Sequence, residues 1–89
     1  MEKRQLTLIN KLGLHARASM KLVDLASGFA SDIQLHYNNT TVDAKSIMNM
    51  MVMGATCGTT IEVIIEGEDE AAAMTAIAQL FNDRFGESE

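Results

Sequence analysis

The sequence predicts an α+β fold of two layers, in which helices cover one face of a sheet and the other face meets water. Segments with alternating apolar residues predict strands, and segments with apolar residues three and four positions apart predict helices. The two kinds follow each other in the order β-α-β-β-α-β-α. Because each element is apolar on one side only, it must bury that side against a second layer. With 89 residues, the chain is long enough for one core, and we expect a single domain over residues 1–89.

The first strand and the first helix are predicted by two different periodicities. Leu6 and Leu8 alternate with polar residues, as in a strand that buries one face. After Gly13 the spacing changes, because apolar residues stand at positions 22, 25, 26 and 29. This stripe predicts a helix over residues 16–27. We expect Gly28 to end the helix in the left-handed conformation that glycine adopts easily.

The next segment predicts a β-hairpin. Alternation over residues 32–37 indicates a second strand, and residues 40–43 indicate a short third strand. Asn38 and Asn39 stand between them, and asparagine tolerates the positive φ angles that a tight hairpin turn needs. The two strands should therefore pair with each other.

A short apolar helix is expected over residues 47–53, with Ser46 as its N-cap and Gly54 after its last residue. Six of its seven residues are apolar, whereas a two-turn helix on a sheet buries only about half of its circumference. If Met50 and Met53 face the sheet, the other apolar side chains form an exposed patch: Ile47, Met48 and Met51. Methionine surfaces adapt to different partners, so we expect partner docking here; loose core filling is the alternative.

The last two elements are a strand and a helix. Apolar residues at positions 61, 63 and 65 alternate with Glu62, Ile64 and Glu66 and indicate a fourth strand. Apolar positions 74, 77, 78, 81 and 85 then trace one face of a third helix, which Arg84 and Gly86 end. The acidic residues 68–70 precede this helix and suit the positive end of its dipole.

Composition limits the kinds of partner. The net charge of -5 disfavours nonspecific binding to nucleic acid or to an anionic membrane, because both are negative. No apolar run approaches the ~20 residues of a membrane span, and the polar first residues contain no signal-peptide core, so we expect a cytoplasmic protein. Cys57 is the single cysteine and cannot form an intrachain disulfide. Together with His15 and His36 it shows no metal-ligand spacing, so we expect neither a metal nor a cofactor.

The candidate reactive residue is His15, in the more basic half of the chain. Residues 1–45 hold six basic and four acidic side chains, whereas residues 46–89 hold one basic and eight acidic side chains. At a helix start, unpaired N–H groups and a partial positive charge stabilise an anion. Imidazole is a nucleophile at neutral pH, and Arg17 can donate charge-assisted hydrogen bonds to phosphate. The alternative is a histidine that only caps the helix or packs against Leu14.

Two motifs resemble those of one protein family. Gly13-Leu-His15-Ala-Arg17 resembles the active-site signature of HPr, the histidine-containing phosphocarriers of the bacterial phosphoenolpyruvate:sugar phosphotransferase system. Lys45-Ser46-Ile47-Met48, followed by Gly54, resembles the segment around the regulatory serine of that family. The interval between the motifs, the length and the element order match as well, so the resemblance covers essentially the whole chain.

The resemblance implies an open-faced sandwich, with a four-stranded antiparallel sheet covered on one face by three helices. It implies that phosphorylated enzyme I transfers a phosphoryl group to Nδ1 of His15, which passes it to a histidine of an enzyme IIA protein. Arg17 and the N–H groups of Ala16, Arg17 and Ala18 would bind the phosphate. Ser46 would be the target of an HPr kinase/phosphorylase as well as a helix cap. The family usually has proline where this chain has Ala18, which adds an N–H donor and removes stiffness from the first turn.

The expected protein is a monomeric carrier rather than a self-sufficient enzyme, because no second catalytic group of its own stands out. Two other functions stay open. A regulatory, nitrogen-type phosphorelay carrier without sugar transport would use the same chemistry with a different acceptor. A noncatalytic interaction domain would use His15 as a cap and the methionine patch as a binding surface for one partner.

Overall fold

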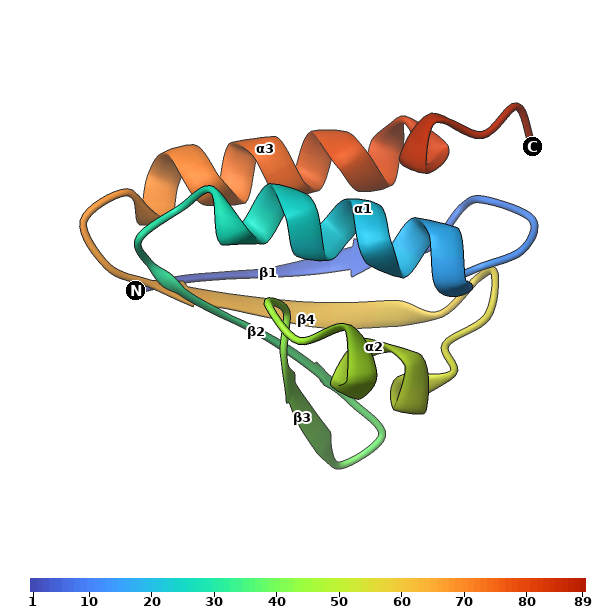
Figure 1. Cartoon of the computed structure of the whole chain (residues 1–89), viewed down its shortest axis with the longest axis horizontal. Helices are drawn as coiled ribbons and strands as arrows, with labels where there is room; N and C mark the ends of the chain where they lie inside the picture. Colours follow the sequence, from blue (N-terminus) through green and yellow to red (C-terminus); the bar gives the residue numbers. More distant parts are fainter.

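The computed structural model describes residues 1–89, which form four strands, three α-helices and one 3₁₀ turn. In chain order these are β1 (Glu2–Thr7), α1 (Ala16–Ser27), β2 (Asp32–Tyr37), β3 (Thr40–Asp43), α2 (Ile47–Met53), β4 (Thr60–Glu66), α3 (Glu70–Asn82) and η1 (Arg84–Gly86). Figure 1 shows α1 and α3 side by side over the sheet. The short helix α2 contacts α1 and β3. No helix has both the length and the apolar character that a membrane crossing requires.

The sheet confirms the predicted fold class. Its strands lie in the order β1-β4-β2-β3, and each neighbouring pair is antiparallel. The register places Leu6 opposite Ile61 and Leu35 opposite Val63, so apolar residues of neighbouring strands share the covered face. The hairpin between β2 and β3 turns at Asn38 and Asn39, whose φ angles are 54° and 62°, as predicted.

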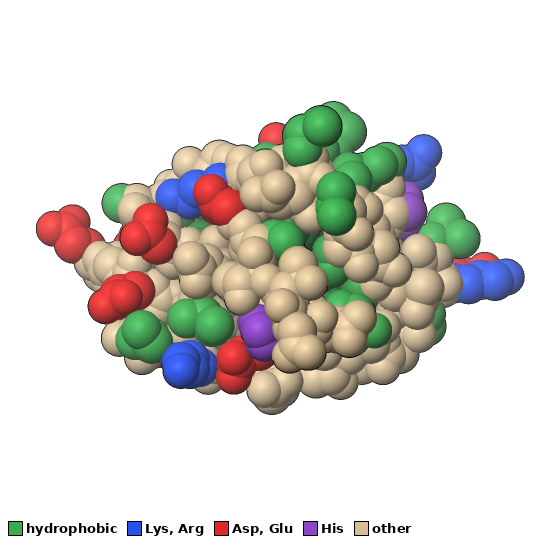
Figure 2. Space-filling model, turned by 90° about the horizontal axis from the view of Figure 1, so that it is seen from below, with side chains coloured by type: hydrophobic (Ala, Val, Ile, Leu, Met, Phe, Trp, Pro, Cys, Tyr) green, Lys and Arg blue, Asp and Glu red, His purple; other side chains and the backbone are tan.

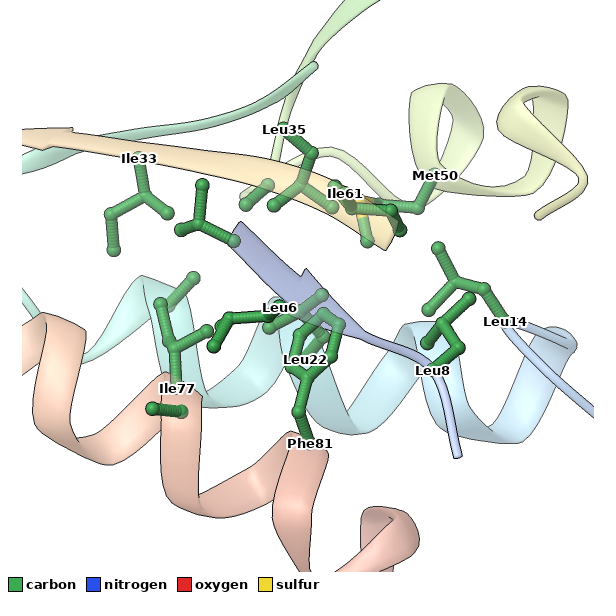
Figure 3. Packing of buried hydrophobic residues seen from close by; sticks show 14 of the residues in the cluster. Leu6, Leu8, Leu14, Leu22, Ile33, Leu35, Met50, Ile61, Ile77 and Phe81 are labelled. Carbon is green, nitrogen blue, oxygen red and sulfur yellow. The ribbon is translucent and has the colours of Figure 1, made fainter. Parts of the chain in front are cut away.

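The core lies between the sheet and the helices and contains 21 buried hydrophobic residues. Figure 3 shows side chains of both layers pointing toward one another, with Leu22 from α1 and Ile77 and Phe81 from α3 on the helical side. Leu6 of β1 and Ile61 of β4 meet them from the sheet. Each fully buried side chain of this size contributes about 1.5–3 kcal/mol relative to its exposed state, so the core holds α1 firmly against the sheet.

Two helix ends show where local signals suffice and where they do not. Gly54 follows the last residue of α2, as predicted, and has φ 61° and ψ 27°, the left-handed conformation that glycine adopts easily. The left-handed conformation predicted for Gly28 is wrong, because Gly28 has φ −78° and ψ −8°. There the chain tightens into a 3₁₀-type turn, because the N–H groups of Gly28 and Phe29 donate to the carbonyls of Leu25 and Ala26, three residues back.

Candidate functional site

His15 occupies the N-cap position of α1. Gly13, with φ +63°, bends the preceding loop against the segment that follows α2. The backbone N–H of Leu14 donates to the carbonyl of Ala55 at 3.0 Å, and the Leu14 side chain is buried. The loop before His15 is thus attached to the segment that follows α2, which fixes where the histidine begins the helix.

The start of α1 offers backbone donors beside this histidine. The first hydrogen bond of the helix joins the N–H of Ser19 to the carbonyl of His15 at 2.8 Å. The N–H groups of Ala16, Arg17 and Ala18 precede that bond and have no partner within the helix. Together with the helix dipole they favour an anion at this end of α1.

The His15 ring does not cap its own helix, so the capping interpretation is wrong. The ring is partly buried, with 26% of the side chain exposed. Its Nε2 atom lies in hydrogen-bond contact with Oε2 of Glu87. Because an ionised carboxylate only accepts hydrogen bonds, Nε2 carries the proton in this contact, and in the neutral ring the lone pair is on Nδ1.

Glu87 is the residue of the site that the sequence does not reveal. Its other oxygen, Oε1, accepts a hydrogen bond from Nδ2 of the buried Asn10 at 3.0 Å, and the same Nδ2 donates to the carbonyl of Gly13 at 2.7 Å. Burial acts to raise the pKa of Glu87, but the hydrogen bonds from Asn10 and His15 and the positive charge of Lys21 outweigh it, so the pKa lies below its ordinary value. The carboxylate beside His15 is therefore ionised at neutral pH.

Three basic side chains surround an open depression at this end of the molecule: Lys11, Arg17 and Lys21. The tail after α3 engages two of them. Lys21 Nζ donates to the carbonyl of Phe85 at 2.6 Å, and Lys11 Nζ lies 3.6 Å from a carboxylate oxygen of Glu89. Arg17 is exposed, lines the same depression and takes part in none of the three ion pairs of the structure. It is the cation with the most freedom to meet an incoming anion.

Helix α2 presents an apolar surface next to α1. Met50 is buried and Met53 is partly buried, whereas Met48 and Met51 are 74% and 49% exposed. Ile47 is partly buried, and Val52, a further apolar residue of the helix, is 80% exposed. We call the four side chains Ile47, Met48, Met51 and Val52 the α2 patch. In Figure 2, hydrophobic side chains gather along one edge of the molecule, with a histidine and basic side chains beside them.

Ser46 is an N-cap in the structure. Its Oγ accepts a hydrogen bond from the N–H of Asn49 at 3.4 Å, and the residue is partly exposed. The neighbouring Lys45 is directed elsewhere, since its Nζ donates to the carbonyl of Phe29 at 2.8 Å. Ser46 therefore lies at the edge of the α2 patch with its capping role established by geometry.

Comparison with known proteins identifies the family. A family model described as "PTS HPr component phosphorylation site" matches residues 2–83. The chain belongs to the HPr family. The phosphocarrier protein HPr of Cupriavidus necator is 49% identical to this chain over 89 residues, and the alignment covers the whole length of both proteins. The phosphocarrier protein HPr of Xylella fastidiosa strain Temecula1 is 51% identical over 87 residues, which are 98% of each chain.

Solved HPr structures have the same fold. The crystal structure of HPr from Thermoanaerobacter tengcongensis matches over the whole of both chains with a TM-score of 0.96 and 38% sequence identity. The structure of an HPr from Bacillus anthracis matches 90% of this chain with a TM-score of 0.86 and 32% identity. The chain is thus an HPr phosphocarrier of the phosphotransferase system.

The structure groups the residues singled out in the sequence into two places. His15, Ala16, Arg17 and Ala18 share the first turn of α1, whereas Ser46 and the α2 patch lie on another helix that contacts α1. Outside these places, Nδ1 of His36 lies 2.7 Å from the hydroxyl of Thr41. Both residues are on the strands of the hairpin, and their register pairs them.

Proposed function

We propose that His15 accepts a phosphoryl group from phosphorylated enzyme I on Nδ1 and passes it to a histidine of an enzyme IIA protein, in sugar uptake and its regulation. The observation that carries the proposal is the contact between Nε2 and Glu87, because it leaves Nδ1 as the ring nitrogen with a free lone pair. In the first step the Nδ1 lone pair of His15 attacks phosphorus while the N–P bond of phosphorylated enzyme I breaks. In the second step a ring nitrogen of the acceptor histidine attacks phosphorus while the N–P bond of His15 breaks. The carrier acts as a cytoplasmic monomer and contributes positioning and charge rather than a second covalent group.

Groups at the start of α1 stabilise the negative charge of the phosphoryl group. Arg17 supplies charge-assisted hydrogen bonds, and the N–H groups of Ala16, Arg17 and Ala18 supply backbone donors. Ala18 provides a donor that a proline could not. A hydrogen bond to a charged group contributes about 1.5–3 kcal/mol, so Arg17→Ala should slow phosphorylation by about 10- to 100-fold.

The test is phosphorylation with purified enzyme I and phosphoenolpyruvate. The wild-type chain should gain one acid-labile phosphate, seen by intact mass, and His15→Ala should gain none. His36→Ala is the matched control and should be labelled like the wild type. Transfer that persists in His15→Ala would refute the proposal. Offering the labelled carrier to sugar-type and nitrogen-type enzyme IIA proteins then decides which branch it serves.

We propose the α2 patch as the docking surface for enzyme I and the enzyme IIA proteins. Met48 and Met51 are exposed, and a flexible apolar surface can fit donor and acceptors in turn. Met48→Lys should raise KM for transfer while kcat stays unchanged, since the residue does not touch the reacting atoms. A lysine at the exposed position of Thr75 on α3 controls for the added charge.

Ser46 would add regulation at the same surface. A phosphate from an HPr kinase/phosphorylase places about two negative charges at the N-terminus of α2, where the helix tolerates them. These charges border the α2 patch and oppose an acidic partner. Ser46→Asp should therefore slow transfer from enzyme I without lowering the midpoint of urea unfolding. Equal transfer rates for Ser46→Asp and wild type would contradict this role.

A further inference from the structure

We infer that Glu87, held by Asn10, is a positioning residue that keeps a proton on Nε2 of His15 throughout phosphoryl transfer and so keeps the phosphoryl group transferable. The inference rests on the proposed function of His15 and names a residue of the tail as part of that site. It concerns a side chain 72 positions away from the histidine in the sequence.

The tail has little freedom to move Glu87 away. Phe85 is fully buried and its ring centroid lies 5.1 Å from that of Phe81, so the chain is anchored two residues before Glu87. Lys21 reinforces the anchor through its 2.6 Å hydrogen bond to the carbonyl of Phe85. Only 15% of the Glu87 side chain is exposed, which protects its contact with His15 from water.

Asn10 fixes the orientation of the carboxylate. This side chain is fully buried, and its Nδ2 joins Oε1 of Glu87 to the carbonyl of Gly13, in the loop that carries His15. One amide thus ties the tail and the loop to each other. With Oε1 held by Asn10, Oε2 points at Nε2 of His15. The arrangement resembles the way an oriented carboxylate fixes the tautomer of a catalytic histidine in enzymes.

The proton on Nε2 matters in both directions of transfer. When Nδ1 attacks phosphorus, the electron pair of the donor N–P bond returns to the donor nitrogen, and the His15 ring becomes positively charged with its proton still on Nε2. Glu87 stabilises that charge through a charge-assisted hydrogen bond. When the phosphoryl group leaves, the N–P electron pair returns to Nδ1 and the ring is neutral again. Without the Nε2 proton the leaving group would be an imidazolate anion, which leaves far less readily.

The first measurement needs no partner protein. Ring ¹⁵N chemical shifts of unphosphorylated His15 at pH 8.5 should show the Nε2–H tautomer as the main form in the wild type. In Glu87→Ala and Asn10→Ala the two tautomers should become mixed. Glu89→Ala is the matched control, because Glu89 is an exposed tail carboxylate that pairs with Lys11. This substitution should leave the tautomer of His15 unchanged. A Nε2–H population that is the same in Glu87→Ala and wild type would overturn the inference.

The second measurement follows the isolated phosphoprotein at pH 8.5. Loss of one charge-assisted hydrogen bond should slow hydrolysis of the N–P bond by about 10-fold or more in Glu87→Gln, with Glu89→Gln unchanged. Urea unfolding of each variant shows whether the fold is intact. Unchanged hydrolysis in a folded Glu87→Gln variant would contradict the role in transfer. If enzyme I labels no form of the protein, the proposed function fails, whereas the tautomer measurement still decides whether Glu87 controls the ring.

Discussion

Replacing Gly13 by alanine should both destabilise the fold and slow phosphorylation of His15. Gly13 has φ +63°, and a Cβ built there would lie 2.7 Å from the carbonyl oxygen of Ala55 and 2.8 Å from Cα of Thr56. Both are backbone atoms, so no side-chain rotation can relieve the contact. The loop that carries His15 must move away from the segment after α2, and the hydrogen bond from Leu14 to Ala55 must lengthen or break.

The expected magnitude has two parts. A left-handed backbone costs alanine about 1–2 kcal/mol relative to glycine. Forcing an extra methyl group into a filled space adds about 1–3 kcal/mol. Gly13→Ala should therefore lose about 2–5 kcal/mol of unfolding free energy. Gly58 is the matched control, because its φ is +91° but nothing lies within 4 Å of its Cβ position, so Gly58→Ala should lose only the backbone part.

The assay is urea unfolding of wild type and both variants, followed by circular dichroism at pH 7. The midpoint of Gly13→Ala should fall further than that of Gly58→Ala, with similar m-values. For a chain of this size, each kcal/mol corresponds to about 4–8 °C in Tm, which gives a second readout. Gly13→Ala should also accept phosphate more slowly from enzyme I. If the two variants are equally stable, the close approach of Gly13 to Ala55 does not constrain the loop.

Two further sets of substitutions test the carboxylate at the start of α3 and the two faces of α2. Hydrogen bonds from the Ser31 hydroxyl and from the backbone N–H groups of Ala30 and Ser31 lower the pKa of Asp69. The ionised carboxylate therefore stabilises the fold at pH values above its unfolded pKa of about 3.9. This contribution disappears as the pH falls through the lower pKa of the folded state. The difference in urea midpoint between wild type and Asp69→Asn should therefore be present at pH 7 and shrink below about pH 4; a constant difference would show that ionisation is not its source. Met50→Ala should cost about 2–5 kcal/mol because Met50 is fully buried, whereas Met48→Ala should stay within about 0.5 kcal/mol of wild type. Equal thermal unfolding temperatures for these two α2 variants would contradict the assignment of their faces.

Most of the fold could be predicted because its signals are local. The apolar stripe of α1, the two asparagines of the hairpin and the serine and glycine around α2 each act within a few residues of their own position. Gly28 shows the limit of such signals. A glycine after a helix permits the left-handed conformation but does not require it, and at Gly28 hydrogen bonds three residues back end the helix instead.

The histidine site could be predicted only in part for a different reason. The start of α1 is one continuous segment, so His15 and Arg17 are recognisable from their spacing. Glu87 reaches His15 only because Phe85 is buried and directs the tail back over the loop, and no periodicity links the two positions. The role of Asn10 could not be predicted either, because nothing in the sequence shows that this polar loop residue is fully buried.

The tail also changes how the charge distribution should be interpreted. The excess of basic residues in the first half of the sequence predicts an anion near His15, and in the folded chain the first anion there is the protein's own Glu87. Lys21 and Lys11 are already engaged by Phe85 and Glu89. In the proposed function, binding of a phosphoryl group therefore depends less on total positive charge than on the donors that the tail leaves unused, which are the guanidinium of Arg17 and the N–H groups of the first turn of α1. A carrier has to release its cargo as readily as it accepts it, and a site whose charge is partly balanced from within suits that requirement.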